Sequence, residues 1–428
     1  MPPPRRRIIE PGLHKHVEIA SFLWGMRGHT VLAPYCTLAT LHEVDGRLDT
    51  HLGALRSDPA RALHACGAPD TWLAGTAFVG AWVAFGAGDE TAAAPVLEVL
   101  EMAPDLGRHV AGALGWLAAD DGAPVVRRLL DAESPDLIRT GISASVIRGD
   151  DPGDPLRRAL AHANPWLRSR ALRAVGELGL RELKPSLADA LSDENDECRF
   201  AAAWSAALLG ETRAIPVLGT LAVDGGARAE QACAVALRAL SLSSACAAHG
   251  EIVREFGASR LPVLAAGMIG DPRFVSWLIE QMDSVTLAPA AGEAFSRITG
   301  ADLAYDDLDG EPPEVQEPDE EPAAEAPKDA DEGYLWPDVD RVAEWWAERE
   351  RDFRKGHRYL LGQPITAEWL KEVLLNGRQP HRAAAAIELA LAFPGRALFD
   401  VRAAAARQDR ALRRDAPQRT VRRRIDSI

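Results

Sequence analysis

A pattern that recurs every 31 residues constrains the fold of this chain more than any other feature. It reads Leu-x3-Leu-x7-Arg-x2-Ala, and two adjacent copies are Leu156, Leu160, Arg168 and Ala171, then Leu187, Leu191, Arg199 and Ala202. Within a copy the leucines lie one helical turn apart, a short polar break follows, and the arginine begins an alanine-rich helix. A helix–turn–helix unit at a fixed period of this length predicts an α-solenoid.

Two further series extend this period through the middle of the chain. Apolar residues that end predicted helices are spaced 31 apart from Phe85 to Leu240, and Ile269 follows after 29 residues. Prolines 95, 124, 155, 185 and 216 recur 29 to 31 residues apart. Proline is tolerated in the first turn of a helix, so we place these prolines at the starts of the second helices. We therefore predict about seven helical hairpins between residues 77 and 298.

The same reasoning divides the all-α chain into five segments. Residues 301–333 hold fourteen acidic residues against one lysine, with five prolines, and cannot bury enough apolar surface to order themselves. Beyond them, residues 370–391 align without gaps to residues 187–208, so a further repeat follows. The predicted segments are an N-terminal helical cap (1–70), a repeat solenoid (71–300), an acidic disordered linker (301–333), a C-terminal helical unit (334–410) and a basic tail (411–428).

Charge and cysteine content indicate which class of partner and which cellular compartment to expect. The formal net charge is −15, of which the acidic segment supplies −13, so the rest of the chain is near −2. This balance disfavours nucleic acid as a partner, although the C-terminal tail is rich in arginine. Five cysteines form no CxxC pair, and the basic N-terminus has no apolar run like that of a signal peptide. We expect a reduced, cytoplasmic protein.

One stretch has to be weighed as a membrane span. Residues 71–88 carry no charge over 18 residues, which is the lower limit for crossing a bilayer. The stretch contains four glycines and lies in register with the first helix of the repeats. We therefore predict a buried helix of the solenoid and no membrane contact.

No motif predicts catalysis, a cofactor or a metal ion. Residues 193–197 (DENDE) have the acidity of a calcium loop, but they lack its glycine and its distant glutamate. His42, His51 and His64, with Cys66, do not have the spacing of a zinc site. The common nucleophile, phosphate-loop and dinucleotide-binding signatures are missing. We predict a protein that is not an enzyme and holds neither cofactor nor metal.

The arginine of the repeat is the first candidate for recognition. It occurs at Arg108, Arg168, Arg199 and Arg382, each at the start of a helix after a polar loop. A guanidinium there could bind an anion. We favour a structural role, in which it pairs with loop carboxylates or carbonyls and keeps successive repeats in register.

Paired arginines are the second candidate. Arg127 with Arg128, and Arg157 with Arg158, lie about one repeat apart on successive second helices. If the second helices line a concave wall, the four side chains form a basic ridge that an acidic partner could bind. The alternative is an ordinary solvated helix face.

An aromatic residue in the repeats is the third candidate. Trp204 occupies the position that Arg173 holds one repeat earlier. A position that accepts both residue types is not expected in a deep core, so Trp204 could be an exposed partner-binding anchor beside Arg173. The alternative is a half-buried packing role.

Two resemblances add to this interpretation. The repeats resemble the short HEAT-like repeats of phycobilin lyases, over roughly residues 77–298. The ends, in HVEIASFLWGMR (16–27) and in WWAERERDFRKGHRYLLGQP (345–364), resemble an uncharacterised proteobacterial HEAT-repeat family. Members of that family are often encoded beside type VI secretion components such as spike and PAAR-type proteins. The resemblance implies an adaptor role and supplies no catalytic residue.

These features predict a non-enzymatic scaffold that binds a protein partner, and the resemblance implies a type VI secretion spike, PAAR-type or effector protein as that partner. Two alternatives stay open at this point. One is a nucleic-acid-binding HEAT-like protein, and the other is a HEAT-repeat enzyme of the lyase or glycosylase type.

Overall fold

The computed structural model describes residues 10–88, 90–313 and 331–414. These residues form 22 α-helices and one antiparallel pair of two-residue strands, so the fold is the predicted all-α solenoid of helical hairpins. The described chain divides into two compact units. The first contains residues 10–209 and 394–414, and the second contains residues 210–393.

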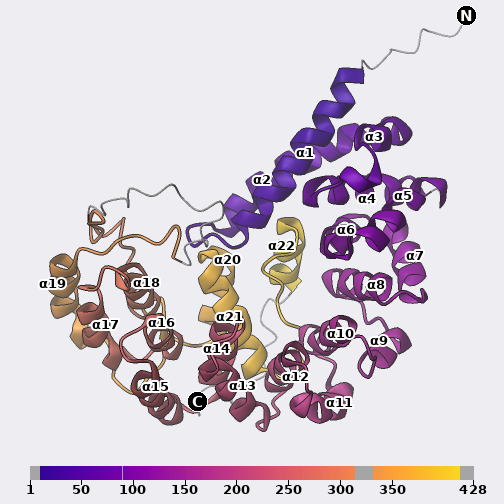
Figure 1. Cartoon of the computed structure of the whole chain (residues 1–428). Coiled ribbons are helices and arrows are strands. Elements are labelled where there is room, and N and C mark those ends of the chain that lie inside the picture. The colour runs from indigo at the N-terminus through magenta and orange to yellow at the C-terminus, as the bar shows by residue number, and fades with distance from the viewer. Residues whose placement is uncertain (1–9, 89, 314–330, 415–428) are drawn as a thin grey trace, which may run out of the picture. The chain divides into compact units, whose positions relative to one another are not determined.

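The first unit begins with three helices of the N-terminal cap, α1 (Glu10–Thr30), α2 (Leu38–Leu55) and α3 (Pro59–Ala65). The first helices of its hairpins are α4 (Ala74–Gly86), α6 (Gly107–Trp116), α8 (Pro135–Arg148), α10 (Pro165–Leu178) and α12 (Asp196–Leu208). The second helices are α5 (Glu90–Met102), α7 (Ala119–Leu130), α9 (Asp154–Ala159) and α11 (Lys184–Asp189). Each first helix packs on the next, from α4 to α12, and the second helices pack beside this row (Figure 1).

The second unit continues the alternation. Its first helices are α14 (Ala229–Ala239), α16 (Arg260–Ile269) and α18 (Ala288–Thr299), and its second helices are α13 (Ala214–Val223), α15 (Leu242–Phe256) and α17 (Val275–Gln281). It then adds α19 (Val339–Arg349), the strands β1 (Tyr359–Leu360) and β2 (Gln363–Pro364), α20 (Ala367–Asn376) and α21 (Gln379–Ala392). The last helix, α22 (Ala405–Arg414), belongs to the first unit. Short 3-10 turns lie at Pro69–Thr71, Pro104–Leu106, Arg181–Leu183, Ala190–Ser192, Pro272–Phe274 and Glu350–Asp352.

The uncharged stretch of residues 71–88 forms α4, and every residue from Ala77 to Phe85 is buried. Small glycines allow neighbours to approach this helix closely. A Cβ added at Gly75 would lie 2.3 Å from the carbonyl oxygen of Ser21 in α1. In the described parts of the chain, no helix combines the length and the apolar character needed to cross a membrane.

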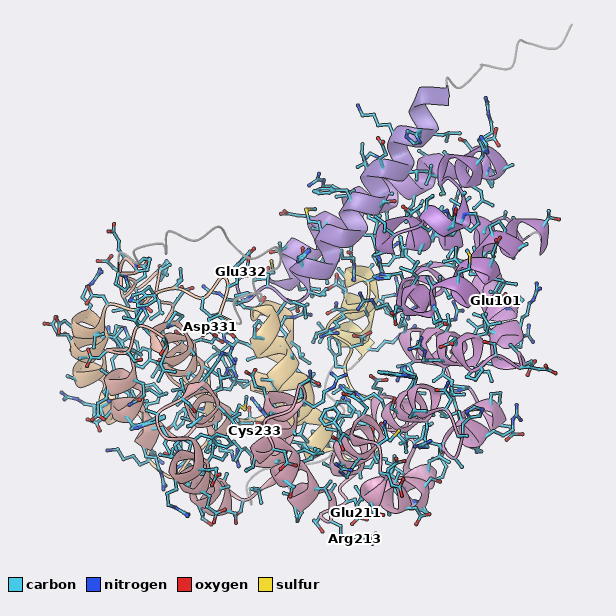
Figure 2. The ribbon with its side chains drawn as sticks, in the orientation of Figure 1. Glu101, Glu211, Arg213, Cys233, Asp331 and Glu332 are labelled. Carbon is cyan, nitrogen blue, oxygen red and sulfur yellow. The ribbon has the colours of Figure 1, made fainter. Side chains whose placement is uncertain are left out.

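The acidic segment differs from its prediction at both ends, because residues 301–313 and 331–333 are ordered. Leu303 and Leu308 are buried, and the main chain at Leu308 and Gly310 pairs with residues 336–338 at 2.7 Å. Asp331 accepts hydrogen bonds from Arg260 at 2.7 and 3.0 Å (Figure 2). The prediction of disorder treated every acidic residue of this segment as solvated. Burial of the two leucines and the pairing of Asp331 with Arg260 stabilise these ends instead. Residues 314–330 of the predicted linker lie outside the described residues.

The predicted C-terminal unit, residues 334–410, does not form one separate body. Residues 334–393 pack within the second unit, where Glu388 pairs with Arg238 of α14 at 3.3 Å. Residues 394–414, called here the C-terminal segment, pack on the first unit. Of the predicted basic tail, only residues 411–414 are described, as the last turn of α22.

Candidate functional site

The ends of the first helices in the first unit present a row of main-chain acceptors. The last four carbonyl groups of an α-helix have no partner within the helix. Gly115 in α6, Ile147 in α8 and Glu177 in α10 supply such carbonyls, one repeat apart along the row. We call these three groups the carbonyl row.

The C-terminal segment supplies the donors for the carbonyl row. The Leu398 N–H donates to Glu177 O at 2.9 Å. Further along, Arg407 donates from Nη2 to Gly115 O at 3.1 Å and from Nη1 to Ile147 O. The segment therefore follows the row from α10 back towards α6, and Figure 1 shows α22 beside the first helices.

The second unit uses the same type of contact. Arg358, just before β1, donates to Leu237 O at 2.9 Å and Leu240 O at 2.8 Å, next to the end of α14. The Leu361 N–H donates to Arg297 O in the last turn of α18 at 2.7 Å. Burial lowers the pKa of Arg358, which is a cost that these carbonyl dipoles offset. Open helix ends thus bind a later stretch of the chain in both units.

A buried ion pair fixes the C-terminal segment to the N-terminal cap. Arg27 of α1 donates from Nε to Asp45 of α2 at 2.7 Å, and from Nη2 to the carbonyls of Arg402 and Ala403 at 2.9 Å each. Asp45 also accepts from the Ala405 N–H at 2.7 Å. Burial raises the pKa of Asp45, while Arg27 and the Ala405 N–H act to lower it.

Alanine substitutions at two equivalent glycines can test the contact with the C-terminal segment. Gly149 and Gly179 end α8 and α10 with φ of 78° and 71°, where any L-residue is strained. A Cβ at Gly149 meets nothing within 4 Å, but at Gly179 it would lie 2.7 Å from Gly395 O. We expect Gly149→Ala to cost about 1–2 kcal/mol in unfolding free energy. Gly179→Ala should cost more and should speed hydrogen exchange in residues 394–398, whereas Gly149→Ala should not.

The paired arginines lie away from this site. Arg127 and Arg128 are exposed at the end of α7, and Arg157 and Arg158 are exposed at the end of α9. Within the first unit, the second helices lie on the side of the first-helix row opposite α22 (Figure 1). The paired arginines therefore do not face the C-terminal segment, and their role in binding an acidic partner stays a prediction.

Trp204 is not an exposed anchor, and that prediction is wrong. It is only 3% exposed, in a helix in which all residues from Phe200 to Leu208 are buried. The Arg173 guanidinium lies over its ring, with Cζ 3.4 Å from the ring centroid. Equivalent positions in successive repeats stack on one another, so the half-buried Arg173 covers the ring of the buried Trp204.

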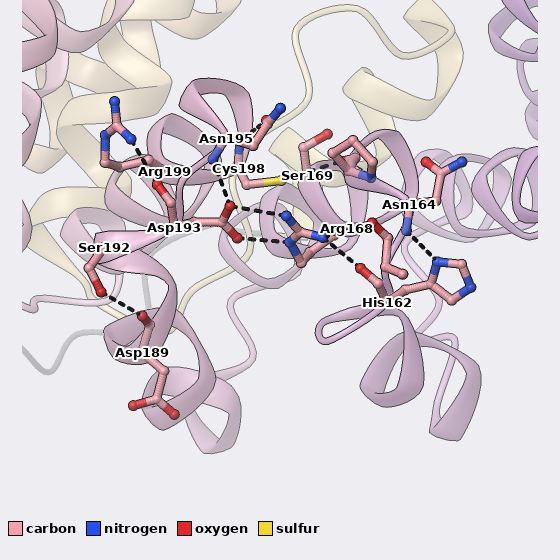
Figure 3. Close-up of polar contacts among 12 residues, drawn as sticks. His162, Asn164, Arg168, Ser169, Asp189, Ser192, Asp193, Asn195, Cys198 and Arg199 are labelled. Carbon is pink, nitrogen blue, oxygen red and sulfur yellow. Dashed lines mark hydrogen bonds and ion pairs between the residues drawn. The ribbon is translucent and has the colours of Figure 1, made fainter.

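Two of the repeat arginines bind the loops between hairpins (Figure 3). Arg168 forms a bidentate pair with Asp193, at 2.8 and 3.0 Å, and donates to His162 O at 2.6 Å. Arg199 repeats the loop contact through Asp193 O at 2.7 Å. The Arg168 guanidinium lowers the pKa of Asp193. These contacts connect α10 to the loop that precedes α12.

The other two repeat arginines differ from this pair. Arg382 is fully buried and donates to Leu374 O at 2.7 Å and to Gln379 at 2.8 Å, so it cannot face a ligand in solution. Arg108 is exposed, and its Nε donates to His109 at 3.0 Å.

Thiols and possible metal ligands give no reactive cluster. Burial raises the pKa of Cys66 and of Cys233 (Figure 2) to about 12, so neither thiol suits a nucleophile near neutral pH. Among the described residues, no group of three or more His, Cys, Asp and Glu side chains is placed to hold a metal ion.

Comparison with known proteins identifies the repeats. A family profile for HEAT repeats matches residues 153–238, which span α9 to α14. The chain therefore contains HEAT repeats, a class of helical hairpin that generally mediates protein–protein interaction. No curated protein matches the sequence.

Proposed function

We propose that this chain is a non-catalytic scaffold that binds a protein partner in the cytoplasm. The observation that carries the proposal is the C-terminal segment on the carbonyl row. A stretch of polypeptide is held there by main-chain and arginine hydrogen bonds, so the face has the chemistry to bind peptide. A stacked scaffold presents such a face preformed, and little ordering cost falls on the scaffold when a partner binds.

The proposal is tested by cross-linking the tagged full-length chain in its source organism and identifying the joined peptides. A scaffold should give reproducible cross-links between one protein and the first unit, at the same positions in replicate purifications. An untagged strain serves as the control. If no protein exceeds that control, the scaffold proposal fails.

The exposed arginine pairs contribute to this proposal as a steering surface for an acidic partner. Changing Arg127, Arg128, Arg157 and Arg158 together to glutamate is expected to slow association about tenfold or more at low salt, and less at high salt. Stopped-flow association with the identified partner measures the effect.

A matched control reverses four exposed arginines elsewhere, namely Arg47, Arg108, Arg254 and Arg351. The arginine pairs lie in the last turns of α7 and α9, where the helix dipole favours positive charge. Each change to glutamate there is therefore also expected to lower the unfolding free energy by about 0.3–1 kcal/mol. If both quadruple variants slow association equally, only net charge matters and the steering role is lost.

The resemblance of the chain ends to a family encoded beside type VI secretion components motivates the first partners to test. We propose a spike, PAAR-type or effector protein. Purified candidates can be titrated against the full-length chain by calorimetry, and a candidate without measurable heat or affinity is excluded.

A further inference from the structure

Hydrogen bonds make up the specific contacts between the C-terminal segment and the first unit. The segment's buried apolar side chains include two alanines, Ala403 and Ala405, and Leu412 is partly buried against Leu38 and Leu41. The segment donates to main-chain carbonyls of the row from the Leu398 N–H and from Arg407. In the other direction, Arg27 donates to carbonyls of the segment itself. Such acceptors are the same in every sequence, so another polypeptide with donors at the same spacing can replace this one.

Arg407 lies in a partly buried setting beside a second arginine, Arg148. Burial lowers the pKa of Arg407, and the neighbouring Arg148 lowers it further. Arg148 itself donates to Leu114 O in the last turn of α6 at 3.0 Å and to Ala119 O at the start of α7 at 3.2 Å. Arg148 and Arg407 thus lie in one region, and the repulsion between them acts equally on an arginine that a partner brings to the same carbonyls.

We propose that the carbonyl row is a binding site for a segment of the protein partner that carries an arginine in the first turn of a helix, as Arg407 is placed in α22. Residues 394–414 occupy this site in cis until the partner displaces them. The inference rests on the proposed scaffold function and names the surface and the chemistry of recognition.

The contacts define what the partner segment must carry. Arg407 reaches two carbonyls of successive repeats, so the partner needs an arginine with both terminal nitrogens free to donate. Ala405 is fully buried beside Leu38 and Leu41, and its N–H donates to Asp45. A small residue two positions before the arginine therefore fits, and a large or N-substituted one does not.

A fluorescent peptide of residues 394–414 tests the inference against the full-length chain by anisotropy. In the wild type the attached segment competes at a high effective concentration, so the peptide should bind weakly. Arg407→Ala in the full chain removes that competition, and the peptide should bind at least tenfold more tightly. Arg407→Lys should fall between the two, because an ammonium cannot span both carbonyls as a guanidinium does.

Two further variants test whether the effect is specific to the contacts with the carbonyl row. Arg410→Ala removes an exposed arginine of the same helix and should leave peptide binding as in wild type. Leu398→Pro removes the N–H that donates to Glu177 without a change in charge, and should tighten peptide binding as Arg407→Ala does. A peptide carrying the Arg407→Ala change should not bind either variant.

The inference is overturned if the Arg407→Ala and Leu398→Pro chains keep wild-type circular dichroism yet bind the peptide no more tightly than wild type. It is also overturned if the cross-linked partner binds without displacing the labelled peptide from the Arg407→Ala chain. In that second case the scaffold function stands, and the partner uses another face.

Discussion

Replacing Arg27 with alanine is expected to lower the unfolding free energy of the first unit by about 3–5 kcal/mol, because it leaves a buried carboxylate without its cation. Asp45 is buried, and Arg27 is its charged partner at 2.7 Å. The change also removes the donors to the Arg402 and Ala403 carbonyls, so the C-terminal segment should loosen. Urea unfolding at pH 7, with hydrogen exchange of α1, α2 and residues 394–414, measures both effects.

The pH dependence separates charge from packing in this variant. Without Arg27 the pKa of Asp45 rises further, so a proton neutralises the folded carboxyl more readily than the unfolded one. The stability gap to wild type should therefore narrow as the pH falls from 7 to 5. An equal gap at both values would assign the loss to packing of Arg27 on the Trp24 and Trp116 rings. Arg47→Ala, an exposed change in α2, should cost less than about 0.5 kcal/mol.

The solenoid architecture could be predicted because a short sequence pattern that specifies one helical hairpin recurs along the chain. Several hairpins share one pattern, with leucines one turn apart, a polar break and an arginine, and Arg168 shows what that arginine contributes in two of them. The repeat near residues 370–391 also forms two packed helices, α20 and α21. A repeat whose own pattern is weak can therefore still be assigned from the register of its neighbours.

The exposure of Trp204 was misjudged although a signal was present. Residues 201–207 read AAAWSAA, small on every side of the helix, and a helix that is apolar all round is a buried one. The comparison with Arg173 gave the opposite result, because it treated equivalent positions as independent when they stack on each other.

The carbonyl row could not be predicted, because its partners are far apart in sequence. Arg407 bonds to carbonyls near residues 115 and 147, and no local pattern encodes that distance. Every residue has a main-chain carbonyl group, so residue types do not indicate which carbonyls act as acceptors. The available hints were an arginine after four alanines at 403–406 and glycine at Gly179, where the chain passes too closely for a side chain.

Replacing Glu293 with glutamine is expected to lower the stability of the second unit by about 3 kcal/mol at pH 7. Burial raises the pKa of Glu293, but His381 and Arg297, each at 3.0 Å, outweigh it and lower the pKa to about 2. The contact joins α18 to α21, so its loss should also speed hydrogen exchange in residues 379–392. Chemical denaturation at pH 7 gives the size of the effect.

The sign of its pH dependence makes this prediction specific. A depressed folded pKa contributes stability that is complete above the unfolded value near 4.5 and is lost as the pH falls towards 2. Wild type and Glu293→Gln should therefore converge as the medium is acidified through that window. Glu280→Gln, an exposed change in α17, should follow wild type throughout. A gap for Glu293→Gln that stays constant from pH 7 to pH 3 would show that the glutamine disturbs packing, and that the buried charge itself adds no stability.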